Sequence, residues 1–171
     1  FLKKLFQTTL RVAKQVRTQT DISRHAVTIP SVVNRLIEQH FIAKSPVHIL
    51  MIGAGEIIKS CAAYLGSQAS VQLTIVNRTL SHAQSLAKQV HGKALPLCEL
   101  SSALLSKQDV IVSGAMVSYP LVTPAMLEQA DIGRSRPALI IDLGVPRNIA
   151  DFRYPGHNLT IYTIDQLSEV I

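Results

Sequence analysis

The stretch VHILMIGAG, residues 47–55, joins an apolar run of strand length to a turn that contains two glycines. A second apolar run, VQLTIV at 71–76, follows after an interval long enough for one helix and ends in Asn77-Arg78-Thr79. Parallel strands joined by a helix bring their carboxyl ends to the same edge of a sheet. The two stretches therefore predict the first strand–helix–strand unit of a dinucleotide-binding fold, with the glycine turn beside the basic turn.

The rest of the chain continues to alternate between short apolar runs and helical patterns. The apolar runs are continuous, which is typical of a parallel sheet that helices cover on both faces. We therefore predict an α/β fold with a doubly wound, Rossmann-type parallel sheet over residues 46–165. The expected strands are 47–52, 71–76, 94–97, 110–113, 138–142 and 159–162, and the expected helices are 55–65, 81–90, 99–105, one from Thr123-Pro124 and one near Asp165.

Two helical patterns precede this domain, at 1–20 and 31–43, before Ser45-Pro46 breaks the chain. We expect both helices to fold against the domain as a connector, residues 1–45, from a missing N-terminal domain. Residues 1–46 contain eight Lys or Arg and two acidic residues, and so carry the formal net charge of +6. This asymmetry fits a polyanionic partner such as nucleic acid, and equally a solvated helix face.

The composition is that of a globular chain, with 171 residues of which 47% are hydrophobic and 16% charged. No apolar run is long enough to span a membrane, and the first residues lack the apolar region of a signal peptide. Because the sequence does not begin with Met, we interpret it as a fragment of a longer protein. Its two cysteines, Cys61 and Cys98, fit a reducing cytoplasm. We expect Cys61 to be a small buried side chain, and no residue stands out as a catalytic group or metal ligand.

The glycine turn is the first part of the candidate site. Gly53 would allow a tight turn, and Gly55 would let the backbone approach a pyrophosphate at the helix N-terminus, where free N–H groups favour an anion. The expected contact residues here are Gly53, Ala54, Gly55, Glu56, Ile57 and Ile58. Ile58 stands where the dinucleotide fingerprint has its third glycine, so we expect it to push the helix slightly away from the strand.

The basic turn indicates which nucleotide is bound. An NAD site has Asp or Glu at the end of the second strand, where it binds the ribose 2′-hydroxyl. This chain has Asn77, Arg78 and Thr79 there instead. Arg78 could bind a 2′-phosphate and stack on adenine, and its two neighbours could add hydrogen bonds. We therefore predict NADPH as the cofactor.

Two further strand ends complete the predicted site. Ser113, Gly114 and Ala115 follow the fourth strand, where small residues leave room for a cofactor. Gly144 and Val145 follow the fifth strand, where a nicotinamide would lie. In the same loop we expect Asp142 to be a polar anchor, and Arg147 either to hold a substrate carboxylate or to bridge to another domain.

Five segments together resemble one family. They are VRTQTDI at 16–22, GAGE at 53–56, NRT at 77–79, DLGVPRNI at 142–149 and IYTIDQL at 161–167. Their order and spacing are similar to those of glutamyl-tRNA reductase, and the resemblance covers essentially the whole chain. Two residues depart from the family pattern, because Gln19 replaces a Glu and Ile58 replaces a Gly.

The resemblance implies a role in tetrapyrrole (porphyrin, heme) biosynthesis. In that family a cysteine of an N-terminal domain attacks glutamyl-tRNA, and hydride from NADPH reduces the resulting thioester to glutamate-1-semialdehyde. The cysteine would lie upstream of Phe1, so this NADPH-binding fragment should be inactive alone. Glutamyl-tRNA is then the partner of the full-length cytoplasmic protein. Residues 166–171 would begin a dimerisation helix, so the full-length protein should be a homodimer and this fragment a monomer.

Two other interpretations remain open at this stage. A shikimate dehydrogenase-like reductase shares the glycine turn and the Asn-Arg-Thr turn and also selects NADPH. A non-catalytic nucleotide-sensing module would bind the nucleotide with the same residues but would catalyse no reaction. A cysteine-bearing domain upstream of Phe1 would favour the tRNA-dependent reductase over both.

Overall fold

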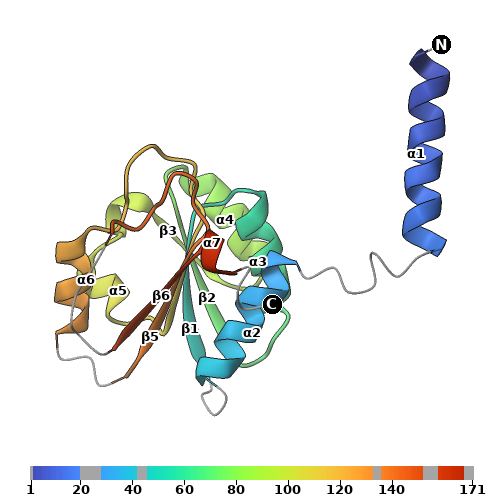
Figure 1. Ribbon diagram of the computed structural model, residues 1–171. Coiled ribbons are helices and arrows are strands. Elements are labelled where there is room, and N and C mark those ends of the chain that lie inside the picture. The colour runs from blue at the N-terminus through green and yellow to red at the C-terminus, as the bar shows by residue number, and fades with distance from the viewer. Residues whose placement is uncertain (1, 20–27, 42–45, 133–135, 152–157, 168–171) are drawn as a thin grey trace.

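A computed structural model describes residues 2–19, 28–41, 46–132, 136–151 and 158–167. Its centre is a six-stranded, all-parallel sheet in the order β3-β2-β1-β4-β5-β6 (Figure 1). The predicted doubly wound α/β fold is therefore confirmed. The strands are β1 (Val47–Ile52), β2 (Val71–Asn77), β3 (Lys93–Pro96), β4 (Val110–Ser113), β5 (Ala138–Asp142) and β6 (Leu159–Thr163).

The strand order reverses between β1 and β4. From β1 the chain adds β2 and β3 on one side, and then crosses back to add β4, β5 and β6 on the other. The register pairs Ile52 with Val76 on β2 and with Ser113 on β4, so the three strands end together. A crevice at the carboxyl edge beside such a reversal is where open α/β sheets bind ligands.

Helices cover both faces of the sheet (Figure 1). One face carries α2 (Ile29–Phe41), α3 (Glu56–Gly66) and α4 (Leu80–Gln89), and the other carries α5 (Ser102–Leu105) and α6 (Pro124–Asp131). Alternate β1 residues enter two separate cores, since Ile49 and Met51 pack with α2, α3 and α4 while Leu50 and Ile52 pack with α5 and α6. The continuous apolar pattern of the strand is thereby explained.

Local sequence accounts for several helix ends. Thr123 caps α6, because its side chain accepts a hydrogen bond from the Met126 N–H, and Pro124 follows in the first turn. The second helix begins at Ile29, before the predicted start at residue 31, because Thr28 and Ser31 exchange side-chain hydrogen bonds around its first turn. The helix predicted over 99–105 is instead a 3-10 turn, η2 (Leu97–Glu99), and the single-turn α5. A last turn, α7 (Ile164–Leu167), follows β6.

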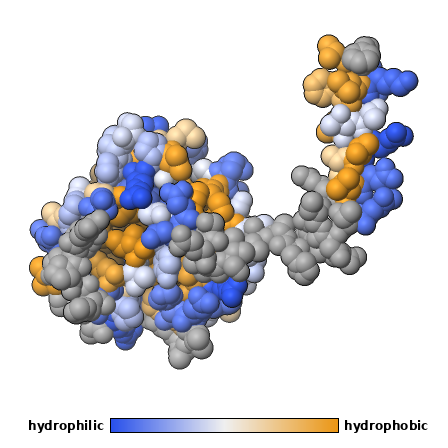
Figure 2. All heavy atoms as spheres, in the orientation of Figure 1, coloured by the Kyte–Doolittle hydropathy of each residue, from blue (hydrophilic) through white to orange (hydrophobic). Residues whose placement is uncertain are grey.

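The expectation that both leading helices fold against the sheet is right for α2 and wrong for α1 (Leu2–Gln19). α2 buries Val32, Val33, Leu36 and Ile37 in the core. α1 stands apart from the sheet with an exposed apolar stripe that includes Leu5, Phe6 and Leu10 (Figure 2). Within the described residues nothing covers this stripe. No helix of that part of the chain combines the length and apolar character needed to cross a membrane.

Parts of the sequence predictions concern positions outside the described residues. They are the domain boundary near residue 45, the Thr20–Ile22 end of the connector motif, and positions 168–171 of the predicted dimerisation helix. The domain limits therefore stay predictions.

Candidate dinucleotide-binding site

A cleft of about 550 Å³ opens at the carboxyl edge of the sheet, between the ends of β1, β2 and β4. It brings together most of the residues that the sequence singled out from three separate segments. The predicted residues on its wall are Gly53, Ala54, Gly55, Glu56, Ile57, Asn77, Arg78, Thr79, Gly114 and Ala115. A larger groove, of about 1090 Å³, lies at the amino ends of the strands, around His48, Lys93 and Arg136, away from these residues.

Gly53 is held in a conformation that only glycine adopts readily. Its φ is +114°, and its N–H donates to the Val76 carbonyl oxygen at 2.8 Å, which ties the turn to the end of β2. A Cβ at this position would lie 3.0 Å from both the Ala115 nitrogen and the Gly114 carbonyl oxygen. The glycine therefore serves a tight turn and also the close approach of the loop after β4.

Gly55 exposes the start of α3 to the cleft. It precedes the first helical residue in an extended conformation, and no side chain caps the helix there. The first-turn N–H groups and the helix dipole therefore favour an anion. Glu56 carries a negative charge at this end, and Lys59 donates to its carboxylate at 2.7 Å on the exposed surface. The sequence analysis did not single out Lys59, although its position three residues after Glu56 places both side chains on the same face of a helix.

Ile58 is fully buried below the cleft, so the structure places this predicted contact residue in the core. Its side chain lies over Gly114, where an added Cβ would come within 2.9 Å of Ile58 Cγ1. The room that the fingerprint obtains from a third glycine on the helix comes here from a glycine after β4. The sequence pattern did not link these two positions, because they lie in different segments.

The turn after β2, where the sequence predicts that the adenosine binds, forms one end of the cleft. The Asn77 side chain donates to the Thr79 carbonyl oxygen at 3.0 Å, which shapes the turn and leaves Arg78 exposed. Among the described residues that line the cleft, the one acidic residue is Glu56, at the start of α3 and not in this turn. A guanidinium at this place suits a phosphate.

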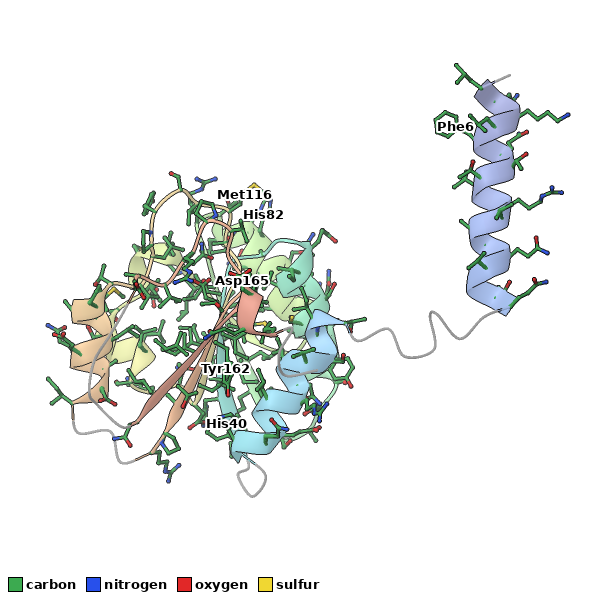
Figure 3. The ribbon with its side chains drawn as sticks, in the orientation of Figure 1. Phe6, His40, His82, Met116, Tyr162 and Asp165 are labelled. Carbon is green, nitrogen blue, oxygen red and sulfur yellow. The ribbon has the colours of Figure 1, made fainter. Side chains whose placement is uncertain are left out.

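Several cleft residues were missed by the sequence reasoning. They are His82, Leu97, Met116, Val117 and Leu121. His82 could have been found from the sequence, because it lies one helical turn after Thr79. In the structure its backbone N–H donates to the Thr79 carbonyl oxygen at 3.1 Å. Met116 and His82 lie at the upper rim in Figure 3. Nothing in the local pattern around Met116 or Leu121 indicated that those loops return to the cleft.

Gly144 and Val145 do not line this cleft. They border a separate small pocket of about 190 Å³, together with Arg147 and Thr163. Their loop is held by Asp142, as expected. One carboxylate oxygen accepts from the Gly144 N–H at 3.0 Å, and the other accepts from Asn148 and Ile149, each at 2.9 Å. Arg147 is exposed and also borders a second pocket, of about 510 Å³, with Asp151 and Asp165.

Replacing Asp142 by alanine is expected to lower the free energy of unfolding by about 3 kcal/mol or more, because three backbone N–H groups lose their buried acceptor. Far-UV circular dichroism during urea unfolding measures this change, and the chain has no Trp for a fluorescence readout. Asp151→Ala, which removes an exposed carboxylate from the same loop region, is the control and should alter stability by less than about 0.5 kcal/mol. Equal effects of the two substitutions would contradict this role.

Cys61 is buried as predicted, and burial raises the pKa of its thiol to about 11. A thiol with that pKa is almost entirely protonated at pH 8, and the thiolate is the reactive form. We therefore expect one fast-reacting thiol, the exposed Cys98, when the native chain is mixed with a thiol reagent at pH 8. The second should react only after denaturant is added. Two fast thiols in the native chain, counted by absorbance, would show that Cys61 is accessible.

Comparison with known proteins agrees with the resemblance seen in the motifs. A family model described as Shikimate / quinate 5-dehydrogenase matches residues 35–170. A glutamyl-tRNA reductase of Xanthomonas oryzae pv. oryzae is 40% identical over 171 residues, which is 99% of this chain and 39% of the relative. One of Xanthomonas campestris pv. phaseoli is also 40% identical, and 40% of it is covered. The chain thus spans about two fifths of the length of these curated relatives.

Comparison with solved structures also finds glutamyl-tRNA reductases. The structure of glutamyl-tRNA reductase from Methanopyrus kandleri matches 99% of this chain and 43% of its own, with a TM-score of 0.76 and 30% identity. The nucleotide-binding domain of the Thermoplasma volcanium glutamyl-tRNA reductase matches 84% of this chain and 91% of its own, with a TM-score of 0.64 and 25% identity. The predicted resemblance is therefore confirmed. The chain belongs to the family described as Shikimate / quinate 5-dehydrogenase, and it corresponds over 99% of its length to glutamyl-tRNA reductases.

Proposed function

We propose that this chain is the NADPH-binding domain of a glutamyl-tRNA reductase, an oxidoreductase of tetrapyrrole synthesis. The observation that carries the proposal is the position of Arg78. It lies at the adenosine end of a cleft that begins with the Gly53 turn, where an NAD site would have an acidic residue. The identity with glutamyl-tRNA reductases supports the same assignment.

Different residues of the cleft would bind different parts of the cofactor. The start of α3 offers N–H groups to a pyrophosphate, and Arg78 offers a guanidinium to a 2′-phosphate. Gly144 and Val145, in the loop that Asp142 holds, border the place proposed for the nicotinamide. The bound cofactor would supply the hydride, and the chain's own residues would orient it and shield it from water. Ser113 and Ile58 are buried, so they would pack beneath the cleft and support its wall without contacting the cofactor.

In the full-length protein we place the reaction on a cysteine outside this chain. Cys61 is unsuited to nucleophilic attack, because it is buried and its thiol has a pKa of about 11. The hydride would reduce an enzyme-bound glutamyl thioester to glutamate-1-semialdehyde, and the fragment alone would be inactive. The full-length protein would act on glutamyl-tRNA as a cytoplasmic homodimer.

The leading segment fits a role near RNA. Lys3, Lys4, Arg11 and Lys14 are exposed on α1, opposite to its apolar stripe (Figure 2). Such charges would add to the field that attracts tRNA, and that contribution weakens as salt rises. Full-length protein with these four residues changed to Gln should then bind tRNA more weakly and with a smaller dependence on salt. Unchanged binding would remove this role from the segment.

The test of cofactor choice is a titration of the 171-residue chain with NADPH and with NADH. The proposal expects NADPH to bind more tightly. Equal or tighter binding of NADH would reject NADPH as the cofactor, and binding of neither would reject the dinucleotide site itself.

A shikimate dehydrogenase-like reductase is the second candidate, favoured by the description of the matching family model. It would use the same cleft and the same basic turn. Turnover of shikimate or quinate with NADP⁺ by the full-length protein would support it, and the 40% identity with glutamyl-tRNA reductases argues for the first proposal. A non-catalytic nucleotide-sensing module would bind NADPH and reduce neither kind of substrate.

A further inference from the structure

Asn148 is a fully buried amide that joins two strand ends below the cofactor cleft. Its side-chain oxygen accepts from the Ser113 hydroxyl at 2.9 Å and from the Ala115 N–H at 2.7 Å. Its side-chain nitrogen donates to the Ala115 carbonyl oxygen at 3.0 Å. The Asn148 amide therefore holds both polar backbone groups of Ala115, in the manner of a neighbouring strand, although its own loop follows β5.

The backbone of Asn148 is held as firmly as its side chain. Its N–H donates to Asp142 at 2.9 Å, and its carbonyl oxygen accepts from Leu121 at 2.7 Å and Val122 at 3.1 Å. Because these three hydrogen bonds fix the backbone of Asn148, its amide has little freedom to follow a movement of Ala115. The distance between the loop after β4 and the loop after β5 is thereby set.

The fixed distance matters because each loop borders a different part of the candidate site. Ala115 is on the wall of the main cleft and lies against Gly53, the residue of the tight turn. Gly144 leads to Val145 in the neighbouring pocket, and a Cβ on Gly144 would come within 2.6 Å of Asn148 Cγ. One amide is thus packed between the loop after β4, which lies against Gly53, and the loop proposed for the nicotinamide.

The side chain at this position must accept and donate at the same time. An aspartate of the same shape can accept from Ser113 and Ala115 N–H, but its second oxygen would face the Ala115 carbonyl oxygen at the place where Asn148 donates. Two acceptors facing each other in a buried site repel, and the loop after β4 would have to shift.

We propose that Asn148 is a positioning residue, which sets the nicotinamide half of the dinucleotide site without touching the cofactor. This inference rests on the proposed NADPH function. It assigns the two ends of the cofactor to separate supports, since the turn around Arg78 is shaped by the Asn77 side chain, which donates to the Thr79 carbonyl oxygen, and the Asn148 amide holds the loop after β4.

The test compares two ligands on native chain and Asn148→Asp. NADPH needs both halves of the site, whereas 2′-AMP, which has no 5′-phosphate for the glycine turn, needs only the adenosine end. The variant is expected to lose about tenfold in NADPH affinity, the effect of one buried hydrogen bond, and to bind 2′-AMP as the native chain does. The fluorescence of the bound reduced nicotinamide should shift toward that of free NADPH in the variant.

Two further variants keep the proposal testable if Asn148→Asp fails to fold. Ser113→Ala removes one donor to the amide and should give a smaller loss of NADPH affinity, with 2′-AMP binding again unaffected. Gly144→Ala forces the amide aside and should give a loss like that of Asn148→Asp. Equal losses for both ligands, or no loss of NADPH affinity, would overturn the positioning role alone. Failure of the native chain to bind either ligand would overturn the proposed function and this inference with it.

Discussion

Arg78→Ala is expected to weaken NADPH binding by about 10- to 100-fold, the range that charge-assisted hydrogen bonds to one phosphate supply. NADH binding should change by less than about threefold, because NADH has no 2′-phosphate for the guanidinium to bind. Titration of the 171-residue chain with each cofactor measures both values. Since Arg78 is exposed, the difference between native chain and variant should shrink as salt is raised.

Arg136→Ala is the matched control for Arg78. It removes an exposed arginine from the groove at the opposite edge of the sheet, so the net charge changes equally while the cofactor cleft is untouched. An equal loss of NADPH affinity in the two variants would show a general charge effect and contradict a specific phosphate contact. An equal loss of NADPH and NADH affinity in Arg78→Ala would show that the arginine supports the turn and does not select the cofactor.

Gly53→Ala is expected to remove most of the cofactor binding and to destabilise the fold by about 1–3 kcal/mol. Two causes act together. The φ of +114° is strained for alanine, and the new methyl group would press on the backbone of Gly114 and Ala115 at about 3.0 Å. Thermal unfolding measures the stability, and titration with NADPH measures the binding.

Gly55→Ala separates these two causes from a direct effect on the ligand. Its φ is −74°, and the nearest atom to an added Cβ is the Gly114 carbonyl oxygen at 3.8 Å, so the fold should keep its melting temperature. The methyl group would still occupy the place where a pyrophosphate approaches α3. We expect weaker NADPH binding with unchanged stability. A Gly53→Ala variant as stable as Gly55→Ala would show that the turn does not need its positive φ.

The strands were predictable because a strand that is buried on both faces has a continuous run of apolar residues in the sequence. β1, β4 and β5 begin and end where the continuous apolar runs predicted. The region after β3 was less predictable. Leu97 was expected in the strand but belongs to a 3-10 turn, and Leu100 and Leu104 fit one helix although Leu100 lies before the single helical turn that contains Leu104. α1 was predicted as a helix from its period, but a period cannot say whether the apolar face finds a partner.

The candidate site could also be predicted only in part. The backbone turns around Gly53 and Arg78 follow from short local patterns, and the structure places them on one cleft. The supports of the site do not follow from local patterns. Asn148 reaches Ser113 and Ala115 across 35 and 33 positions, and Ile58 fills the space left by Gly114. Such contacts depend on which strands become neighbours, which is decided by the sheet as a whole.

The contact between Ile58 and Gly114 couples these two positions energetically. A Cβ at 114 would come within 2.9 Å of Ile58 Cγ1, so a larger residue at 114 would require the Ile58 side chain to shift. Replacing the buried Ile58 by glycine would leave a cavity in the core. The effects of changing both positions together should therefore differ from the sum of the two single changes.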